Sequence, residues 1–203
     1  MYELLVLSLL MHWPLHAYRI ASMADNILGP EEHLSRGTLS LLLAKIERSG
    51  LITDADPAQI VFPSDRPSRA LAITPLGRER FMHLMLDTTS HPGTYRKFFH
   101  VKALHLELLP LEQQLFLVEH YLNTCLSMIR SKEKEMQEFG ASPHKREHMG
   151  SLFHERALAY MRLKTEQWQL EVAWVRSLQA QLLAGLSAGH VSRAPVSERG
   201  DTP

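Results

Sequence analysis

The sequence contains a single cysteine, Cys125, among 203 residues. One cysteine excludes a disulfide framework and a cysteine-rich zinc or iron–sulfur centre. The longest apolar run, residues 4–11, is interrupted by Ser8 and is far shorter than the roughly 18 residues that a membrane helix needs. No basic segment precedes this run, which argues against a signal peptide. We therefore expect a soluble protein of the reducing cytoplasm, with no membrane partner.

An excess of charge of one sign is also missing, because 22 basic and 22 acidic residues give a formal net charge of +0. This balance excludes a chain that coats nucleic acid through bulk charge. The sequence has no glycine-rich phosphate loop, no Walker lysine and no Gly-x-Ser-x-Gly elbow. We expect no catalytic residues, no cofactor and no enzyme activity. Cys125 lies in an apolar helical stripe and is interpreted as a core residue.

Glycine and proline are scarce between residues 110 and 184, which predicts two long helices at 111–139 and 145–183. Residues of the second helix recur in steps of three, four or seven, which is heptad spacing. They are Met149, Phe153, Tyr160, Leu163, Gln167, Leu170 and Trp174. A helix of about 55–60 Å is too long for so small a chain to cover, so we predict a homodimer through this helix. The polar residues 185–203 are expected to form a disordered tail.

The first part of the chain has shorter elements. Apolar periodicity and caps predict helices at 2–12, 17–27 and from Ser35 to Gly50. Two β-prone runs at 59–63 and 69–74, joined by a turn at 64–68, predict a hairpin. Thr74-Pro75 then begins a fourth helix that ends near residue 86. Three helices, a hairpin and a further helix are the plan of a winged helix-turn-helix.

The predicted fold is therefore mainly α, with a winged helix-turn-helix domain followed by a long-helix dimerisation domain. We place the domains at 1–87 and 94–184, because residues 88–93 form the clearest boundary. A single helix is expected at 96–109, between that boundary and the long helices. The polar tail at 185–203 completes the expected organisation.

The third helix offers candidate DNA contacts. Residues 1–86 hold eight basic and nine acidic residues, so a DNA-binding face must come from arrangement rather than net charge. The amino-terminal end of a recognition helix enters the major groove in such domains, and an arginine there can read a guanine edge. Lys45, with Arg66 and Arg69 beside the turn, is expected to contact the phosphate backbone. The predicted groove contacts are Ser35, Arg36, Thr38 and Ser40.

Several segments resemble, in order and spacing, the PadR family of bacterial transcription regulators. They are HAYRI at 16–20, SRGTLSLL at 35–42, KIERSGLI at 45–52, and RPSR at 66–69 with ITPLGR at 73–78. The family patterns are Gly-Tyr-Glu-Leu, Ser-Pro-Gly-Thr-Leu-Tyr-Pro-Leu, a Gly-Leu-Ile ending and Leu-Thr-x-x-Gly-Arg. This sequence departs from them at Ala17, Arg36 and Ser40, and it has no wing tyrosine before Ile73. Gly37 and the leucines are expected to serve packing.

The resemblance implies a dimeric transcription regulator, expected to be a repressor that binds an inverted-repeat operator in double-stranded DNA. It also implies a site for a small-molecule effector, such as a phenolic acid or a planar drug. Large aromatic side chains can stack on a flat ligand, although they also pack in helical cores. The candidate effector residues are Trp168, Trp174 and Tyr160.

Two alternatives to this hypothesis remain open from the sequence. A winged helix can act as a protein-interaction scaffold that does not bind DNA, and the near-neutral first domain fits that interpretation. A metal-responsive regulator could use the histidine-rich helical region, where His144 and His148 share a helix face near His154 and Glu155. No third ligand stands at a diagnostic spacing, so no metal ligands are assigned.

Overall fold

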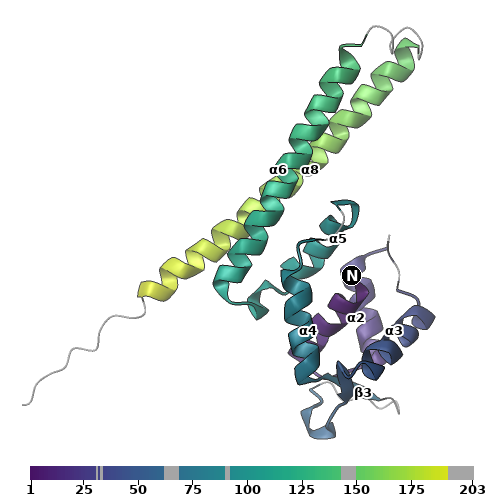
Figure 1. Cartoon of the computed structure of the whole chain (residues 1–203), viewed down its shortest axis with the longest axis vertical. Helices are drawn as coiled ribbons and strands as arrows, with labels where there is room; N and C mark the ends of the chain where they lie inside the picture. Colours follow the sequence, from purple (N-terminus) through teal and green to yellow (C-terminus); the bar gives the residue numbers. More distant parts are fainter. Residues whose placement is uncertain (31, 33, 62–68, 90–91, 143–149, 192–203) are drawn as a thin grey trace, which may run out of the picture. The chain divides into compact units, whose positions relative to one another are not determined.

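The structure is a computed structural model that describes residues 1–203 except 31, 33, 62–68, 90–91, 143–149 and 192–203. The chain divides into two compact units, Met1–Leu109 and Pro110–Pro203 (Figure 1). Both are mainly helical, and the first also contains a small sheet. Within the described ranges, no helix combines the length and the apolar character needed to cross a membrane.

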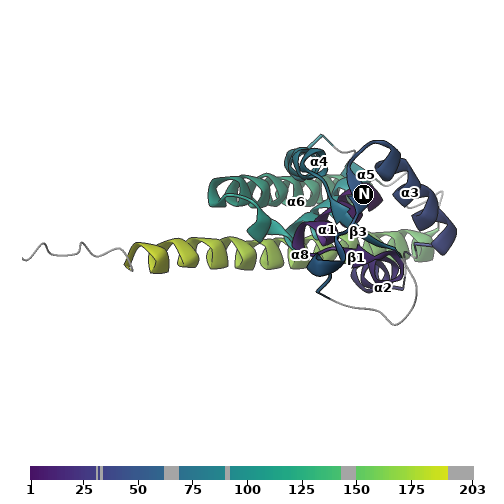
Figure 2. The ribbon, with the colours of Figure 1, turned by 90° about the horizontal axis from the view of Figure 1, so that it is seen from below.

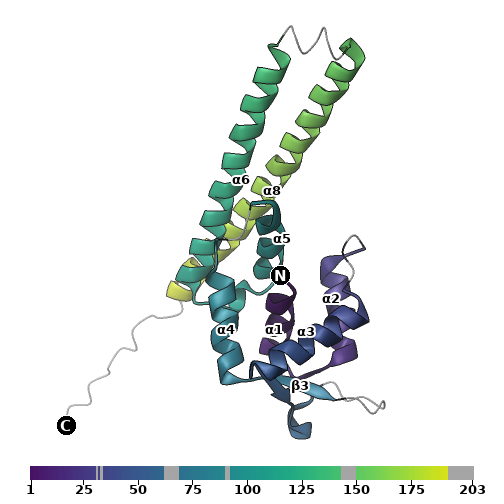
Figure 3. The ribbon, with the colours of Figure 1, turned by 45° about the vertical axis from the view of Figure 1, so that its right-hand side comes forward.

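The first unit is built around helix α1 (Tyr2–His12), in which every residue from Leu4 to Leu10 is buried. Figures 2 and 3 show the other helices of the winged-helix region arranged around α1. A helix that is apolar on all sides must be covered on all sides, which explains its central place. The surrounding helices are α2 (Ala17–Leu28), α3 (Arg36–Arg48) and α4 (Pro75–Leu86).

Three short antiparallel strands form the sheet in the order β1-β3-β2. They are β1 (Leu15–His16), β2 (Ile52–Asp54) and β3 (Ala70–Ile73). The helices and this sheet confirm the winged helix-turn-helix fold. In the register, Leu15 lies opposite Leu71, and Ile52 lies opposite Ile73.

The first hairpin strand predicted at 59–63 is wrong for residues 59–61, and residues 62–63 lie outside the described part of the chain. β3 pairs instead with β2, the strand that follows α3 in the chain. Residues Pro57–Gln59 form a 3-10 turn, η1. Proline cannot donate to a strand ladder, and the Asp56 carboxylate accepts a hydrogen bond from the Ala58 N–H, which stabilises the turn. The predicted turn at 64–68 lies outside the described residues.

Helix limits follow the local signals in the sequence. Ser35 caps α3 by accepting a hydrogen bond from the Thr38 N–H (3.1 Å), and Thr74 caps α4 by accepting one from the Gly77 N–H (3.0 Å). After α3, Gly50 adopts a φ of 72°, and its N–H donates to the Glu47 carbonyl. Together with the bond from the Leu51 N–H to the Ile46 carbonyl (3.0 Å), this bond forms a Schellman stop, which requires the left-handed region at Gly50.

The helix predicted over 96–109 is shorter than expected. Helix α5 spans Pro92–Ala103, and a separate 3-10 turn, η2, spans Leu106–Leu108. Leu109 is extended (φ −108°, ψ 152°) because it precedes Pro110, and the residue before a proline avoids the helical region. Both elements belong to the first unit, which ends at Leu109. The domain boundary predicted at residues 88–93 stays a prediction.

The second unit consists of two long helices that lie side by side, α6 (Leu111–Gly140) and α8 (Ser151–Val191) (Figure 1). Buried residues of α6 include Leu117, Val118 and Cys125, and α8 contributes Val172 and Val175. Helix α8 continues past Gly185, where the tail was expected to begin, and residues 192–203 lie outside the description.

One polar pair lies inside this helical hairpin. Tyr121 is fully buried, and its hydroxyl donates a hydrogen bond to the Glu171 carboxylate (2.8 Å), which is also buried. Burial, and then this bond, raise the pKa of Tyr121, so the phenol stays protonated and remains a donor. The bond joins α6 to α8 inside the hairpin, and replacing either residue would remove a buried hydrogen bond.

Lys102, in α5, carries a buried charge in the first unit. Its side chain is fully covered, and its ammonium donates to the backbone carbonyl of Asp87. Burial lowers the pKa of Lys102 from 10.5 to about 8, against a smaller opposing effect of the Asp87 carboxylate. Below pH 8 the folded chain therefore carries the full cost of holding this charge, at most about 3 kcal/mol.

We expect Lys102→Met to raise the free energy of unfolding by roughly 1–2 kcal/mol at pH 7, because the lost hydrogen bond offsets part of the gain. The unfolded chain binds more protons than the folded chain between pH 8 and 10.5. The free energy of unfolding of the wild type therefore rises with pH in that window, and its difference from the variant becomes smaller. Urea unfolding at pH 7, 8.5 and 10 measures this. Lys45→Met, at an exposed lysine, is the control, and an advantage of Lys102→Met that stays constant with pH would contradict the assignment.

Candidate nucleic-acid interface

The first turn of α3 is exposed, and it carries all four residues predicted to contact the groove. Ser35, Arg36, Thr38 and Ser40 are each solvent-exposed. The Ser35 and Thr38 hydroxyls lie 2.9 Å apart, and Ser35 also caps the helix. The Ser35 and Thr38 hydroxyls are thus hydrogen-bonded to each other. Arg36 and Ser40 extend the polar surface of this turn. The positive end of the helix dipole adds to the attraction for a phosphate.

Helix α3 has one buried apolar face and one exposed face. Leu39, Leu43 and Ile46 are buried in the first unit. The opposite face exposes Leu41 (76%) together with Lys45 and Arg48. A helix held by one apolar face and carrying cations on the other has the layout of a recognition helix.

Arg69 was predicted to contact phosphate, and it lies in a tight ion-pair network. Its guanidinium donates to the Asp54 carboxylate and to the Glu47 carboxylate, each at 2.5 Å. The hydrogen bonds that Arg69 donates to Asp54 and then to Glu47 raise the pKa of its guanidinium, so it stays charged. The network joins α3, β2 and the residue before β3. Arg69 therefore neutralises one acid in α3 and one in β2. Arg66 lies outside the described residues.

A hollow of about 960 Å³ lies between α2 and α3 in the first unit. Its lining includes Arg36, Ser40 and Arg69, three of the predicted DNA-binding residues. Asp25 and Glu47 also line it, so the floor is not uniformly cationic. The structure thus brings these three residues to one face, with the exposed turn of α3 at its rim.

Gly37 does not have the packing role that the sequence predicted. It is exposed, and a Cβ at this position would have only the Ser35 hydroxyl oxygen as a neighbour, at 3.9 Å. The fold therefore tolerates a side chain at Gly37. A glycine that leaves bare backbone on the exposed turn of α3 permits close approach by a ligand, a role that packing arguments overlook.

The three candidate effector residues lie on α8, but a single chain does not gather them into one pocket. Tyr160 is 59% exposed and Trp174 is 38% exposed, while Trp168 is partly buried. Tyr160 and Trp174 share a face but lie roughly 21 Å apart along the axis at 1.5 Å per residue. The ammonium of Lys164 lies 5.4 Å from the ring centre of Tyr160. Their effector role stays a prediction.

The histidines considered for a metal in the helical region are only partly described, since His144 and His148 fall within residues 143–149. His154 is buried and stacks on Phe139 (ring centres 4.8 Å apart), with its Nε2 3.3 Å from the Phe139 carbonyl oxygen. It therefore packs inside the helical hairpin. Glu155, the next residue of α8, is exposed.

Comparisons with known proteins find no matching family model and no matching curated protein. Among solved structures, the chain is similar to Bacillus subtilis PadR in complex with operator DNA, with a TM-score of 0.39 and 18% identity. That match covers 89% of this chain and 98% of the other. The same protein in complex with p-coumaric acid gives 0.38 and 18%, covering 89% and 97%.

The Vibrio cholerae virulence activator AphA is also similar, with a TM-score of 0.37 and 17% identity, over 91% of this chain and 99% of the other. The PadR structures carry the name of the family that the sequence motifs resemble. The winged-helix assignment itself rests on the element order and strand pairing of this chain.

Proposed function

We propose that this protein is a dimeric, non-enzymatic transcription regulator of the PadR type, which binds operator DNA in the cytoplasm through α3. The observation that carries the proposal is the exposed first turn of α3, with Arg36 and Ser40 on a helix whose other face is buried. The winged-helix topology and the motifs at 35–42 and 73–78 support it. Ser35, Thr38, Lys45, Arg66 and Arg69 complete the proposed DNA contacts.

The local charge of α3 supports binding to DNA even though the chain is neutral overall. The helix contains three cations, Arg36, Lys45 and Arg48, and one acid, Glu47. Arg69 pairs with that acid, which leaves the cations of α3 dominant on its exposed face. Local arrangement therefore supplies the positive field that composition lacks. The salt dependence of affinity should reflect the few phosphates these groups contact.

Dimerisation through α8 is supported by its exposed apolar residues. The heptad residues Phe153, Tyr160, Leu163, Leu170 and Trp174 are between 38% and 73% exposed. Val172 and Val175, on another face of α8, are buried within the hairpin. A second copy would cover the exposed stripe, and a two-fold axis would present two α3 helices to an inverted repeat.

We further propose that a small aromatic effector releases the protein from its operator, so that it acts as a repressor. An effector shifts the equilibrium only by its differential affinity for the two states. Tyr160, Trp168 and Trp174 offer aromatic faces, and pairing of two α8 helices would bring faces from both copies together. Loss of operator binding on adding phenolic acids, measured on the intact dimer, tests this part.

Arg36→Ala is expected to weaken binding to the specific operator by about 1–3 kcal/mol while changing binding to scrambled DNA little, because a bidentate contact reads one base. Fluorescence anisotropy with DNA from upstream of the gene, against scrambled DNA at two salt concentrations, measures this. Lys45→Ala is the matched control. It should weaken binding to both DNAs alike and reduce the salt slope by roughly one.

If Arg36→Ala lost the same affinity for both DNAs, Arg36 would not read a base, although the protein would still bind DNA. Feeble, salt-independent binding of the wild-type chain to every DNA tested, including fragments selected from random sequence, would overturn the regulator. The winged-helix scaffold would then be the better interpretation.

A further inference from the structure

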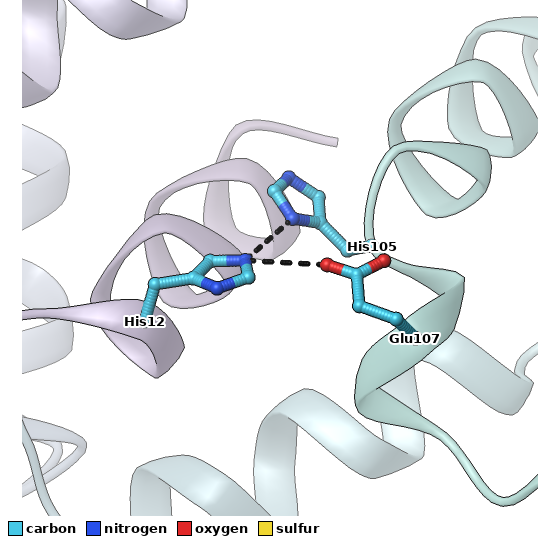
Figure 4. A group of neighbouring side chains, drawn as sticks. All are labelled: His12, His105 and Glu107. Atoms are coloured by element: carbon cyan, nitrogen blue, oxygen red, sulfur yellow. Dashed lines mark hydrogen bonds and ion pairs between the residues drawn. The ribbon is translucent and has the colours of Figure 1, made fainter.

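Three potential metal ligands meet in the first unit, at the end of α1 and around η2 (Figure 4). The His12 Nε2 lies 3.1 Å from the His105 Nδ1 and 3.7 Å from a carboxylate oxygen of Glu107. One ligand atom from each of the three residues lies within 4.8 Å of the others. His12 and His105 are 93 positions apart in sequence, so only the fold brings them together.

The separations suit a small first-row metal ion. Zinc binds imidazole nitrogen and carboxylate oxygen at about 2.0–2.2 Å, and tetrahedral geometry then places neighbouring ligand atoms roughly 3.3 Å apart. The 3.1 Å and 3.7 Å separations lie within a few tenths of an ångström of that value. The third separation, between ligand atoms of His105 and Glu107, is within 4.8 Å, and the exposed Glu107 side chain can rotate towards the imidazoles to shorten it.

The surroundings of the three residues also favour a cation. His12 is the last residue of α1, where the helix dipole is negative. His105 is 5% exposed, which holds its ring in place, whereas the Glu107 side chain is 62% exposed. A cation here would meet one fixed ligand, one half-buried ligand and one carboxylate at the surface, with solvent able to complete the coordination.

We propose that His12, His105 and Glu107 bind a divalent first-row transition metal ion, most naturally Zn²⁺, with water as the remaining ligand. Two imidazoles and one carboxylate match zinc chemistry, whereas magnesium and calcium prefer all-oxygen ligands. This site is distinct from the histidines of the helical region. It also does not depend on the proposed DNA-binding function.

Metal binding would join the end of α1 to the last turn of the first unit. Glu107 lies two residues before Leu109, where the first unit ends, and α6 begins at Leu111. An ion that binds only the folded chain stabilises it by mass action. The bound metal would therefore hold η2 against α1.

The test is a titration of the metal-free full-length chain with Zn²⁺ alone, by calorimetry, with Co²⁺ absorption as a second probe of coordination. We expect the wild type to bind at this site, and His12→Gln and Glu107→Gln each to lose at least roughly tenfold to a hundredfold in affinity. His83→Gln, which removes an exposed histidine of α4, is the matched control and should bind like the wild type.

Circular dichroism must show each variant folded, and Glu107→Gln keeps the test informative because that side chain is exposed and its removal leaves the core intact. A His144→Gln/His148→Gln variant should also bind like the wild type. Three results would overturn the proposal: no zinc binding by the wild type, unchanged affinity in both ligand variants, or loss of binding only in the His144/His148 variant.

Discussion

Replacing Gly77 by alanine is expected to destabilise the first unit by about 3 kcal/mol or more, the largest stability effect of any single substitution considered. A Cβ at Gly77 would lie 2.1 Å from the Leu51 carbonyl oxygen and 2.7 Å from the Ile73 Cγ1. The oxygen belongs to the backbone and already accepts a hydrogen bond from the Thr74 N–H. It cannot move without breaking the junction of α3, β2 and α4, so the cost exceeds that of ordinary overpacking.

Gly37→Ala is the matched control, since Gly37 is also helical but exposed, with nothing closer than 3.9 Å to an added Cβ. It should fold as well as the wild type and gain roughly 0.5–1 kcal/mol from the higher helix propensity of alanine. Chemical denaturation of both variants measures the difference. Similar stabilities for Gly77→Ala and the wild type would contradict the close approach of α4 to the Leu51 carbonyl.

Both glycines belong to motifs read from the sequence, yet the motifs have different physical origins. In the Thr-x-x-Gly box, Thr74 caps α4 and its hydroxyl also donates to the Gly50 carbonyl (2.6 Å), while Gly77 provides room for Leu51. That motif is structural. Gly37 has no such partner in the fold, so its place on the exposed turn of α3 is better explained by what α3 binds.

Features that depend on neighbouring residues were predictable from the sequence. The caps at Ser35 and Thr74 and the stop at Gly50 each follow from one side chain or one φ angle. The limits of α1, α2 and α6 were predicted to within a residue for the same reason. In each of them the apolar pattern continues until a proline or glycine lies at or just beyond the helix end.

Features that depend on distant residues were not predictable in this way. β2 is only three residues long, so its period-2 pattern is too short to identify, and its pairing with β3 is a tertiary choice. The ion pairs of Arg69 with Glu47 and Asp54 join residues 22 and 15 positions away. His12 and His105 are further apart still, so sequence spacing gave no signal for that cluster.

The stripe on α8 combines both cases, because its spacing is local in the sequence but the second copy proposed to cover it is another molecule. Replacing Leu163 and Leu170 together by glutamate is expected to raise the dimer dissociation constant at least 1000-fold, which corresponds to about 4 kcal/mol. The two leucines are 48% and 73% exposed in the single chain. Each would contribute roughly 1.5–3 kcal/mol when buried in a dimer, and a two-fold interface counts every position twice.

Exposure in the single chain is what makes this experiment decisive. Glutamates at exposed positions leave the packing of α6 on α8 intact, so the variant should keep its helical content and lose only association. Sedimentation equilibrium across a range of concentrations separates monomer from dimer. Glutamates at Gln169 and Ala173, which are also exposed on α8 but lie outside the stripe, form the control with an equal number of introduced carboxylates.

The control should remain dimeric, and the monomeric Leu163/Leu170 variant should also bind the operator more weakly than the wild type, since each half-site would then bind alone. A Leu163→Glu/Leu170→Glu variant that stays dimeric would show that the chain associates through another surface. In that case the heptad spacing of α8 would serve a different partner, and the two-fold arrangement of α3 helices on an inverted repeat would lose its structural basis.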